Sequence, residues 1–337
     1  MAVQNPSLLI TVTPAESGIK LLSFLEKRLE GSVPSGQLHR WVRTGQVRVN
    51  KKRAKPFMRL ADGDAVRVPP FAQVQDCAPL PAIAAWPQIL WQSPTGAALR
   101  VVGSSGGILA LHKPAGLAVQ PGSGLHESVS QILADLHDGC PFTPAPAHRL
   151  DRHTSGLLLV GLTHAAQMEL CGWFARKDAL IKEYLAWVAG RWPGDAGWLD
   201  LCDHIRKEAG ADGRERMVVV PGSKALAGDE PARCAVRSPG AIHWPHKTDN
   251  GATTGAEAGT TAMASLLSVR LITGRTHQIR VQLASRGFPL IGDRRYNGPP
   301  YPRLLLHAHR ITLPDGSVFV SPPDWPPPFR LLPGQDI

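Results

Sequence analysis

The sequence predicts a two-domain α+β protein, and three observations support this expectation. A length of 337 residues suits a large domain beside a small one, and a hydrophobic content of 43% is enough for a sizeable core. Helical and strand-like patterns of apolar residues both occur. Residues 1–70 hold 12 Lys and Arg against 5 Asp and Glu, a net +7, while the rest of the chain is only +3. We therefore expect a small basic lobe that docks a polyanion, attached to a nearly neutral body.

The composition also narrows the class of protein. The formal net charge is +10 and the pI is near 9.7. The sequence has no run of about 18 apolar residues that would suit a membrane span, and its first residues lack the pattern of a signal peptide. The five cysteines form no CxxC pair and no zinc-like cluster: Cys77, Cys140, Cys171, Cys202 and Cys234. We expect a soluble protein of the reducing cytoplasm, with no membrane contact.

Two amphipathic helices are predicted early in the chain. Ser17 is placed to cap the first, over 18–30, while Ser35 opens the second and Gly45 ends it. Apolar residues recur at helical spacing in both: Ile19, Leu22, Leu25 and Leu29 in the first, and Leu38, Trp41 and Val42 in the second.

Two short strands are predicted after these helices. Residues 46–50 alternate between polar and apolar, 51–53 turn the chain, and 64–68 alternate again. The run 43–70, RTGQVRVNKKRAKPFMRLADGDAVRVPP, resembles the S-four-type RNA-binding module. The resemblance implies that the second helix and the following turn face RNA phosphates.

The basic residues of this lobe form one continuous candidate surface. Arg40 and Arg43 lie three residues apart, so they project from one side of the second helix. An ordinary solvated face is the alternative, but almost no acidic residues are interleaved, which favours RNA. Such contacts supply affinity rather than sequence choice. The predicted contacts are Arg40, Arg43, Lys51, Lys52, Arg53 and Lys55.

Composition suggests the domain boundaries. Residues 1–70 form the small lobe, and 71–100, rich in Pro, Ala and Gln, are predicted to be a linker. The large domain then spans 101–337. Within it, about 225–262 is dense in Gly, Ala, Thr and Ser, and we expect a surface loop there.

The most informative segment of the large domain is 148–156, His-Arg-Leu-Asp-Arg-His-Thr-Ser-Gly, which precedes the apolar run 157–160. Asp151 stands between Arg149 and Arg152 at the edge of a predicted buried strand. A carboxylate in that setting usually serves an ion pair. The segment resembles the signature of RluA-type pseudouridine synthases, and this resemblance implies that Asp151 is catalytic.

Other segments match the same family in the same order. They are LALHKPAGLAVQPGSG (109–124), IKEYLAWVAG (181–190), TGRTHQIRVQLASRGFPLIGDRRYNG (273–298) and LLLHAHRITLP (304–314). VRVNKKR and AVQPGSG are most similar to the RluC subgroup, which acts on large-subunit ribosomal RNA. The resemblance implies an α+β pseudouridine synthase fold with a mixed, mostly antiparallel central sheet.

The resemblance also assigns roles to residues. Arg280 would pair with Asp151, and Tyr184 would stack on or near the base, although a strand tyrosine otherwise fills core. Arg149 would enter the RNA near the target nucleotide. Leu306 would line the apolar side of the pocket. Without the resemblance, the same leucine would be interpreted as an ordinary core residue. The same segments add four further substrate or RNA contacts: Arg275, Thr276, His277 and Gln278.

The chemistry sets what the site must provide. Converting uridine to pseudouridine breaks the bond from ribose to base nitrogen, rotates the base and rejoins it through carbon. No electrons or groups enter or leave, so neither a redox cofactor nor a metal is required. The target base must leave the stack, because its glycosidic bond is inaccessible inside a helix. Asp151 would act on the ribose as a nucleophile or as a base, and the sequence leaves both possibilities open.

Several alternatives remain at this level. His277, His307 and His309 could suggest a metal site, but no cysteine and few acidic residues are placed to complete one. A hydrolytic nucleosidase would want a second carboxylate, for which Asp293 is the candidate, whereas the resemblance makes it a structural turn residue. Lys113 would meet a phosphate. An inactive RNA-binding factor and a transfer RNA substrate are further alternatives. The expected partner is ribosomal RNA, and no obligatory protein partner is inferred.

Overall fold

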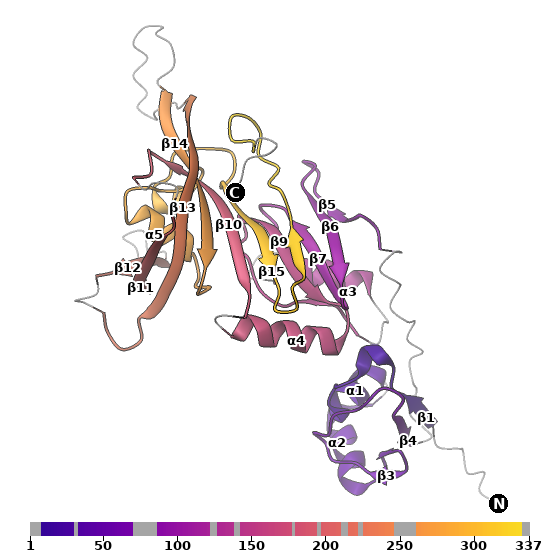
Figure 1. Cartoon of the computed structure of the whole chain (residues 1–337). Coiled ribbons are helices and arrows are strands. Elements are labelled where there is room, and N and C mark those ends of the chain that lie inside the picture. Colours follow the sequence, from indigo (N-terminus) through magenta and orange to yellow (C-terminus); the bar gives the residue numbers. More distant parts are fainter. Residues whose placement is uncertain are drawn as a thin grey trace, which may run out of the picture.

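The computed structural model describes residues 8–29, 33–69, 86–121, 127–137, 142–176, 179–193, 197–209, 215–221, 225–245 and 261–331. A small N-terminal lobe lies beside the end of a large domain, which is built on one broad sheet (Figure 1). Within these residues, no helix is both long enough and apolar enough to cross a membrane.

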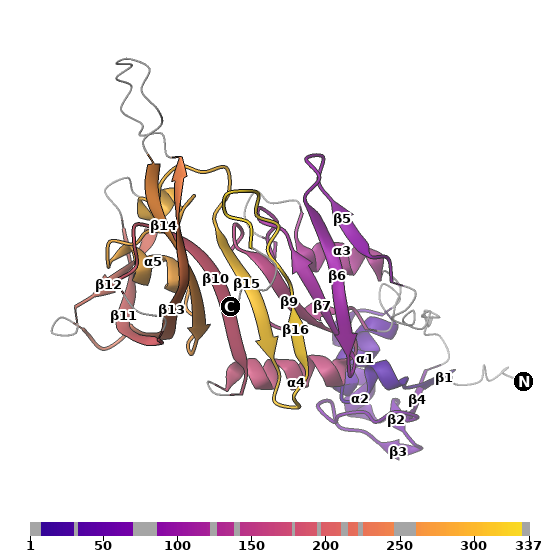
Figure 2. The ribbon, with the colours of Figure 1, turned by 45° about the horizontal axis from the view of Figure 1, so that its top comes forward.

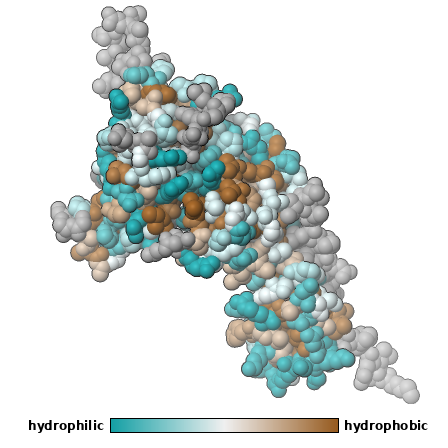
Figure 3. Space-filling model, viewed as in Figure 1, coloured by the Kyte–Doolittle hydropathy of each residue, from teal (hydrophilic) through white to brown (hydrophobic). Residues whose placement is uncertain are grey.

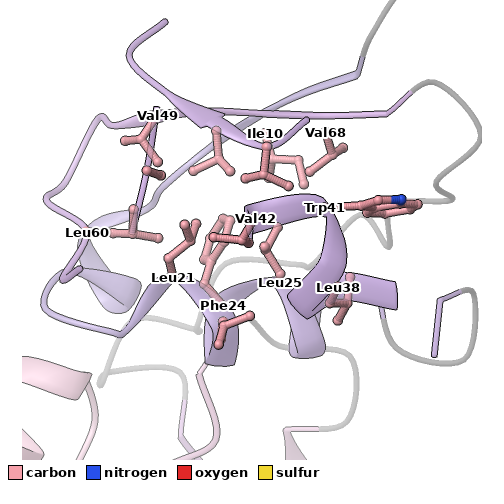
Figure 4. Close-up of a cluster of buried hydrophobic side chains, with 14 of the residues drawn as sticks. Ile10, Leu21, Phe24, Leu25, Leu38, Trp41, Val42, Val49, Leu60 and Val68 are labelled. Carbon is pink, nitrogen blue, oxygen red and sulfur yellow. The ribbon is translucent and has the colours of Figure 1, made fainter. Parts of the chain in front are cut away.

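The small lobe packs two helices against a small sheet. Its strands are paired antiparallel in the order β1-β4-β2-β3. Apolar side chains from the helices and the sheet face one another in a common core (Figure 4). The elements are β1 (Leu8–Thr11), α1 (Leu21–Arg28), α2 (Ser35–Thr44), β2 (Arg48–Val49), β3 (Lys52–Arg53) and β4 (Ala65–Val68).

The predicted helices and strands of this lobe are present, with shifted ends. The expected Ser17 cap is wrong: α1 begins at Leu21, because a 3₁₀ turn (Pro14–Glu16) and Gly18, at φ 87°, come first. The end of α2 at Gly45 is confirmed, since this residue is left-handed at φ 76° and its N–H bonds the carbonyls of Trp41 and Val42.

The turn expected at 51–53 lies one residue earlier. Asn50 and Lys51 take positive φ values of 49° and 66°, which form a two-residue hairpin turn. Lys52 and Arg53 therefore belong to strand β3. Strand β1 pairs with β4 and is an addition to the elements that the sequence predicts.

The large domain is a mostly antiparallel sheet, as predicted. Its order is β12-β11-β13-β14-β10-β15-β9-β7-β6-β5, with β16 paired to β15 and β8 to β9, and the β15–β9 pair is parallel. The strands are β5 (Ile89–Gln92), β6 (Ala98–Ser105), β7 (Ile108–Lys113), β8 (Ala145–Pro146), β9 (Ser155–Gly161), β10 (Ile181–Ala189), β11 (Leu199–Ala209), β12 (Glu215–Val220), β13 (Glu230–Pro245), β14 (Thr261–Leu271), β15 (Leu306–Thr312) and β16 (Val318–Val320).

Helices cover both faces of this sheet. They are α3 (Val129–Leu136), α4 (His164–Ala175) and α5 (Gln278–Ala284), and α5 lies at the β11–β12 end of the sheet. In β9, Leu158 faces the core that contains α3, whereas Leu157 faces the core that contains α4. The buried strand expected at 157–160 is thus confirmed. Figure 2 shows β10, β15, β9 and β7 side by side, with α4 across their lower ends.

Two expected irregular segments contain strands. The predicted linker 71–100 includes β5 and the start of β6, so the sheet begins before residue 101; residues 70–85 lie outside the described part. The loop expected at 225–262 contains all of β13, and 246–260 lie outside the described part. The pairing of β13 shifts register between Arg237 and Gly240, which breaks the alternation that marks a strand.

Candidate active site

Asp151 lies in a turn that leads into β9. The backbone N–H of Thr154 donates to the carbonyl of Asp151 at 3.1 Å, which closes the turn. Gly156 follows at φ 113°, and a Cβ there would collide with the backbone of Ala308. Only glycine therefore lets β9 approach β15 this closely. This approach places Asp151 beside the first residues of β15.

Arg280 of α5 bridges two carboxylates. Its Nη1 lies 3.4 Å from Oδ2 of Asp151, so the predicted ion pair is present as a long contact. Its Nε and Nη2 donate to the two oxygens of Asp293 at 2.7 and 2.8 Å. The side chain of Asp293 is 0% exposed. Burial disfavours the charge on Arg280, but the hydrogen bond and charge of Asp293, with the charge of Asp151, raise its pKa overall.

His277 also approaches the catalytic candidate. It is left-handed at φ 54° immediately before α5. Its Nε2 lies 3.8 Å from Oδ2 of Asp151, and its Nδ1 lies 3.0 Å from the hydroxyl of Tyr296. Burial lowers the pKa of His277 to about 4, against the negative charge of Asp151, so the ring is neutral near pH 7.

Tyr184 and Leu306 line the same hollow as Asp151. Tyr184 stands in β10 opposite Ala308 of β15, and the strand predicted around it is confirmed. Burial, and then the charge of Asp151, raises the pKa of the Tyr184 phenol, which therefore stays protonated and able to donate. Leu306 is 3% exposed at the start of β15.

Two adjoining hollows open at this point. The smaller, of about 100 Å³, gathers nine residues singled out from the sequence: Arg149, Asp151, Tyr184, Arg275, Thr276, His277, Gln278, Arg280 and Leu306. The larger cleft, of about 1010 Å³, shares Asp151 and Arg280 with it and is strongly basic. Seven arginines line this cleft: Arg149, Arg152, Arg216, Arg280, Arg294, Arg295 and Arg303.

Gln278 and Arg275, both expected to contact RNA, have partners within the protein. Gln278 is 3% exposed; its Oε1 accepts from Thr273 Oγ1 and Arg275 N, and its Nε2 donates to the carbonyl of Arg233. We therefore assign Gln278 to shaping the turn before α5 rather than to RNA. Arg275 is half-buried, with Nη1 3.5 Å from Glu230, whereas Thr276 is exposed.

Lys113 differs from expectation. It is 0% exposed, and its Nζ donates to the carbonyls of Pro114, Leu117 and Arg152 at 2.9, 2.9 and 3.1 Å. A buried ammonium with three internal acceptors has no free donor for a phosphate, so that expectation is wrong. Lys113 instead ties β7 to the Asp151 turn. Burial lowers its pKa to about 7, while the charge of Asp151 raises it.

Burial of Lys113 predicts a pH-dependent stability. Between about pH 7 and 10.5 the unfolded lysine holds its proton while the folded one releases it. The unfolded state then binds more protons, so the free energy of unfolding should rise with pH across that window. Denaturant unfolding of wild type and Lys113→Met at several pH values measures this rise, which the variant should lack. Parallel curves would mean that the three carbonyls keep Lys113 charged.

The histidines of β15 make hydrogen bonds within the protein. His307 Nδ1 bonds Ser155 Oγ and its Nε2 bonds the carbonyl of Ser321, both at 2.8 Å. His309 Nδ1 bonds the same carbonyl at 2.9 Å. No group of three or more His, Cys, Asp or Glu suited to a metal ion occurs in the ranges that the structure describes.

The basic residues of the small lobe form a separate surface. Arg40, Arg43, Arg53 and Lys55 line a hollow of about 460 Å³ beside α2, whereas Lys51 and Lys52 are exposed outside it. The guanidinium of Arg53 donates to the carbonyl of Arg43 at 2.6 Å, so it closes the end of α2. Hydrophilic side chains cover much of the outer end of this lobe (Figure 3).

Comparisons with known proteins agree on one family. The model of the RNA pseudouridylate synthase family matches residues 107–285. Ribosomal large subunit pseudouridine synthase C of Yersinia pestis is 34% identical over 326 residues, covering 91% of this chain and 88% of that protein. The protein of that name from Escherichia coli (strain K12) is 32% identical over 313 residues, covering 91% and 86%. In fold, the chain is similar to human RNA Pseudouridylate Synthase Domain Containing 1, with a TM-score of 0.51, 24% identity and coverage of 67% of this chain and 83% of that one.

Proposed function

The chain belongs to the RNA pseudouridylate synthase family and isomerises uridine in RNA to pseudouridine, and we propose that its substrate is large-subunit ribosomal RNA. The support for this substrate is the named target of relatives that are 34% and 32% identical and cover 91% of the chain. The observation that carries the catalytic assignment is the meeting of Asp151, Arg280 and Tyr184 in one hollow that opens into an arginine-lined cleft.

Asp151 is assigned the step on the ribose. Its carboxylate acts as nucleophile or base while the bond from ribose to base nitrogen breaks, and the freed base then rotates and rejoins through carbon. Arg280 and His277 both approach Oδ2. Oδ1 is therefore the oxygen that acts on the sugar.

The remaining residues of the hollow hold the flipped nucleotide. Tyr184 lies against the base and keeps a hydrogen to donate, because burial raises the pKa of its phenol. Leu306 forms the apolar wall. Arg149 is exposed and lines both hollows, a position from which its planar guanidinium stacks in the space that the base vacates.

The cleft supplies the contact with the RNA backbone. Its lining combines seven arginines with only two acids, Asp151 and Asp293, and both of these acids contact Arg280. A polyanionic strand is the ligand that such a lining favours.

Mapping pseudouridine tests the substrate. Carbodiimide-based detection would be applied to RNA from cells with and without this gene, and then to large-subunit, small-subunit and transfer RNA treated with the pure protein. We expect sites that depend on the gene in large-subunit RNA alone. Sites confined to transfer RNA would contradict the proposed substrate, and release of free uracil would identify a nucleosidase.

We assign docking of RNA to the small lobe, as in S-four-type modules. Its sequence carries +7 of the +10 formal charge and none of the catalytic candidates. A cytoplasmic site of action follows from a ribosomal substrate and suits the free thiols of Cys171, Cys202 and Cys234. Catalysis needs no obligatory protein partner in this proposal.

Neutralising this lobe should reduce the salt dependence of RNA binding. The variant changes Arg40, Arg43, Lys52 and Lys55 to Gln in the full chain, all of them exposed. Each lost phosphate contact should lower the slope of log affinity against log salt by about 0.9 on a duplex, or about 0.7 on a single strand. The rate at saturating RNA should persist. Arg67→Gln, exposed on β4 away from the hollow, is the control, and an unchanged slope in the fourfold variant would contradict docking.

A further inference from the structure

One short turn holds both residues that contact the carboxylate of Asp151. The turn comprises residues 293–296, which are Asp293 and the 3₁₀ turn Arg294–Tyr296. Its first residue binds Arg280 and its last binds His277. The ring of Tyr296 also lies 5.2 Å from the guanidinium of Arg280. Arg280 and His277, the two side chains that reach Asp151, are thus both bound by this turn.

Asp293 fixes the orientation of Arg280. Two parallel hydrogen bonds, of 2.7 and 2.8 Å, define the plane of the guanidinium. With Nε and Nη2 occupied, Nη1 is the nitrogen that points at Asp151. No recorded contact joins Asp293 to Asp151 among the described residues, so Asp293 acts on it through Arg280.

Tyr296 fixes which nitrogen of His277 carries the hydrogen. Oδ2 of Asp151 lies 3.8 Å from Nε2 of His277, and a carboxylate at that position favours the neutral tautomer with its hydrogen on Nε2, so that Nδ1 accepts from Tyr296. The hydroxyl hydrogen is then directed to Nδ1 of His277. In a neutral ring the other nitrogen, Nε2, must carry the hydrogen, and Nε2 is the atom that faces Asp151.

The backbone makes this turn rigid. The N–H of Gly298 donates to the carbonyl of Asp293 at 2.8 Å, and that of Arg295 to its Oδ1 at 3.2 Å. Glycines stand on both sides: a Cβ at Gly292 would collide with the carbonyl of Arg303, and one at Gly298 with the carbonyl of Leu290. A turn so confined can hold Arg280 and His277 in fixed places.

We infer that the 293–296 turn is the positioning element of the catalytic carboxylate. Asp293 aims Arg280, Tyr296 aims His277, and together they hold Oδ2 of Asp151 so that Oδ1 is presented to the ribose. This inference rests on the proposed role of Asp151. Neither Asp293 nor Tyr296 touches substrate in it, and both are positioning residues.

Asp293→Asn tests the contact that runs through Arg280 to Asp151. Asn keeps one acceptor but sets an NH₂ against a guanidinium donor, so Arg280 should swing away from Asp151. We expect single-turnover isomerisation to slow by about 100-fold, the loss that a misplacement of about 1 Å produces, while the affinity for RNA stays unchanged. The matched control is Asp203→Asn, since Asp203 binds Arg286 through two bonds of 2.9 and 3.1 Å away from the cleft. The control should keep the wild-type rate.

A double-mutant cycle separates positioning from general structural damage. If Asp293 acts through Arg280, Asp293→Asn should slow an Arg280→Met enzyme by no more than about twofold. A further loss of about 100-fold in that background would show that Asp293 acts independently, and would overturn the inference.

Tyr296→Phe tests the contact that runs through His277 to Asp151. It also keeps the inference testable if the Asp293→Asn variant does not fold. It removes only the hydroxyl, so a rate loss of about tenfold with unchanged affinity is expected. Wild-type rates in the folded variants would overturn the inference. The Asp151→Asn enzyme is assayed beside them: if it is active, the proposed role of Asp151 fails, and if it is inactive while the turn variants are normal, only the positioning role fails.

Discussion

Asp151→Asn is expected to abolish pseudouridine formation while leaving RNA binding intact. Asn keeps the shape of the side chain but loses the charge that acts on the ribose. Loss of a general base alone costs about 10²–10⁴-fold in rate, and loss of a nucleophile costs more. The Asp151 side chain is 20% exposed, and its contact with Arg280 is 3.4 Å long, so the fold should tolerate the change. Carbodiimide detection on treated RNA measures the product, and filter binding measures affinity.

The control for this variant is the same chemical change elsewhere. Asp203→Asn also removes a carboxylate paired with an arginine, but Asp203 does not line the cleft, so its activity should match wild type. Appreciable turnover by the Asp151 variant would remove this residue from the mechanism. Loss of RNA binding in parallel with activity would show that Asp151 serves the docking surface instead.

Arg280→Met should damage both activity and stability. The rate falls because Asp151 loses the donor that orients its Oδ2. Stability falls because Asp293, 0% exposed, loses both of its charged hydrogen bonds. An uncompensated buried charge typically costs about 3–5 kcal/mol. Denaturant unfolding and single-turnover assays measure the two effects, and a folded variant with near-normal turnover would contradict the ion pair.

Two further variants identify the source of the instability. Arg286→Met strands Asp203, whose side chain is 13% exposed, so it should cost less stability and leave the rate unchanged. Arg280→Met combined with Asp293→Asn removes both buried charges, and it should be more stable than Arg280→Met alone while remaining slow. If the combined variant is no more stable, the stranded carboxylate is not the cause.

Much of the site was predictable from the sequence because it is built from contiguous segments. Asp151 and Arg149 lie in one run, and 275–280 form another, so their identities follow from motifs in the printed order. The helix that ends at Gly45 and the strand at 157–160 followed from local periodicity and an end-capping residue. Family membership and the mostly antiparallel sheet agree with those motifs.

Other predictions failed where pairing distant in sequence decides the outcome. Strand β5 lies in a Pro- and Ala-rich stretch and forms because β6 pairs beside it, which composition does not reveal. Strand β13 lies where the composition predicts a loop, because its register shift and small residues obscure the alternation. Lys113 and Gln278 carry side chains that suit a phosphate or a base, yet the fold buries both against backbone carbonyls.

By itself, the sequence indicated the family and the reaction that the comparisons support, because residue types and their order within each motif are local properties of the chain. Only the tertiary structure decided which side chains surround Asp151. Asp293 and Arg280 stand 13 positions apart in the sequence. The chain contains many other acidic residues and arginines, and no local pattern tells which carboxylate meets which guanidinium. That choice depends on burial, because a charged side chain that is removed from water needs a partner of opposite charge. The 293–296 turn packs against α5, and this packing pairs Asp293 with Arg280.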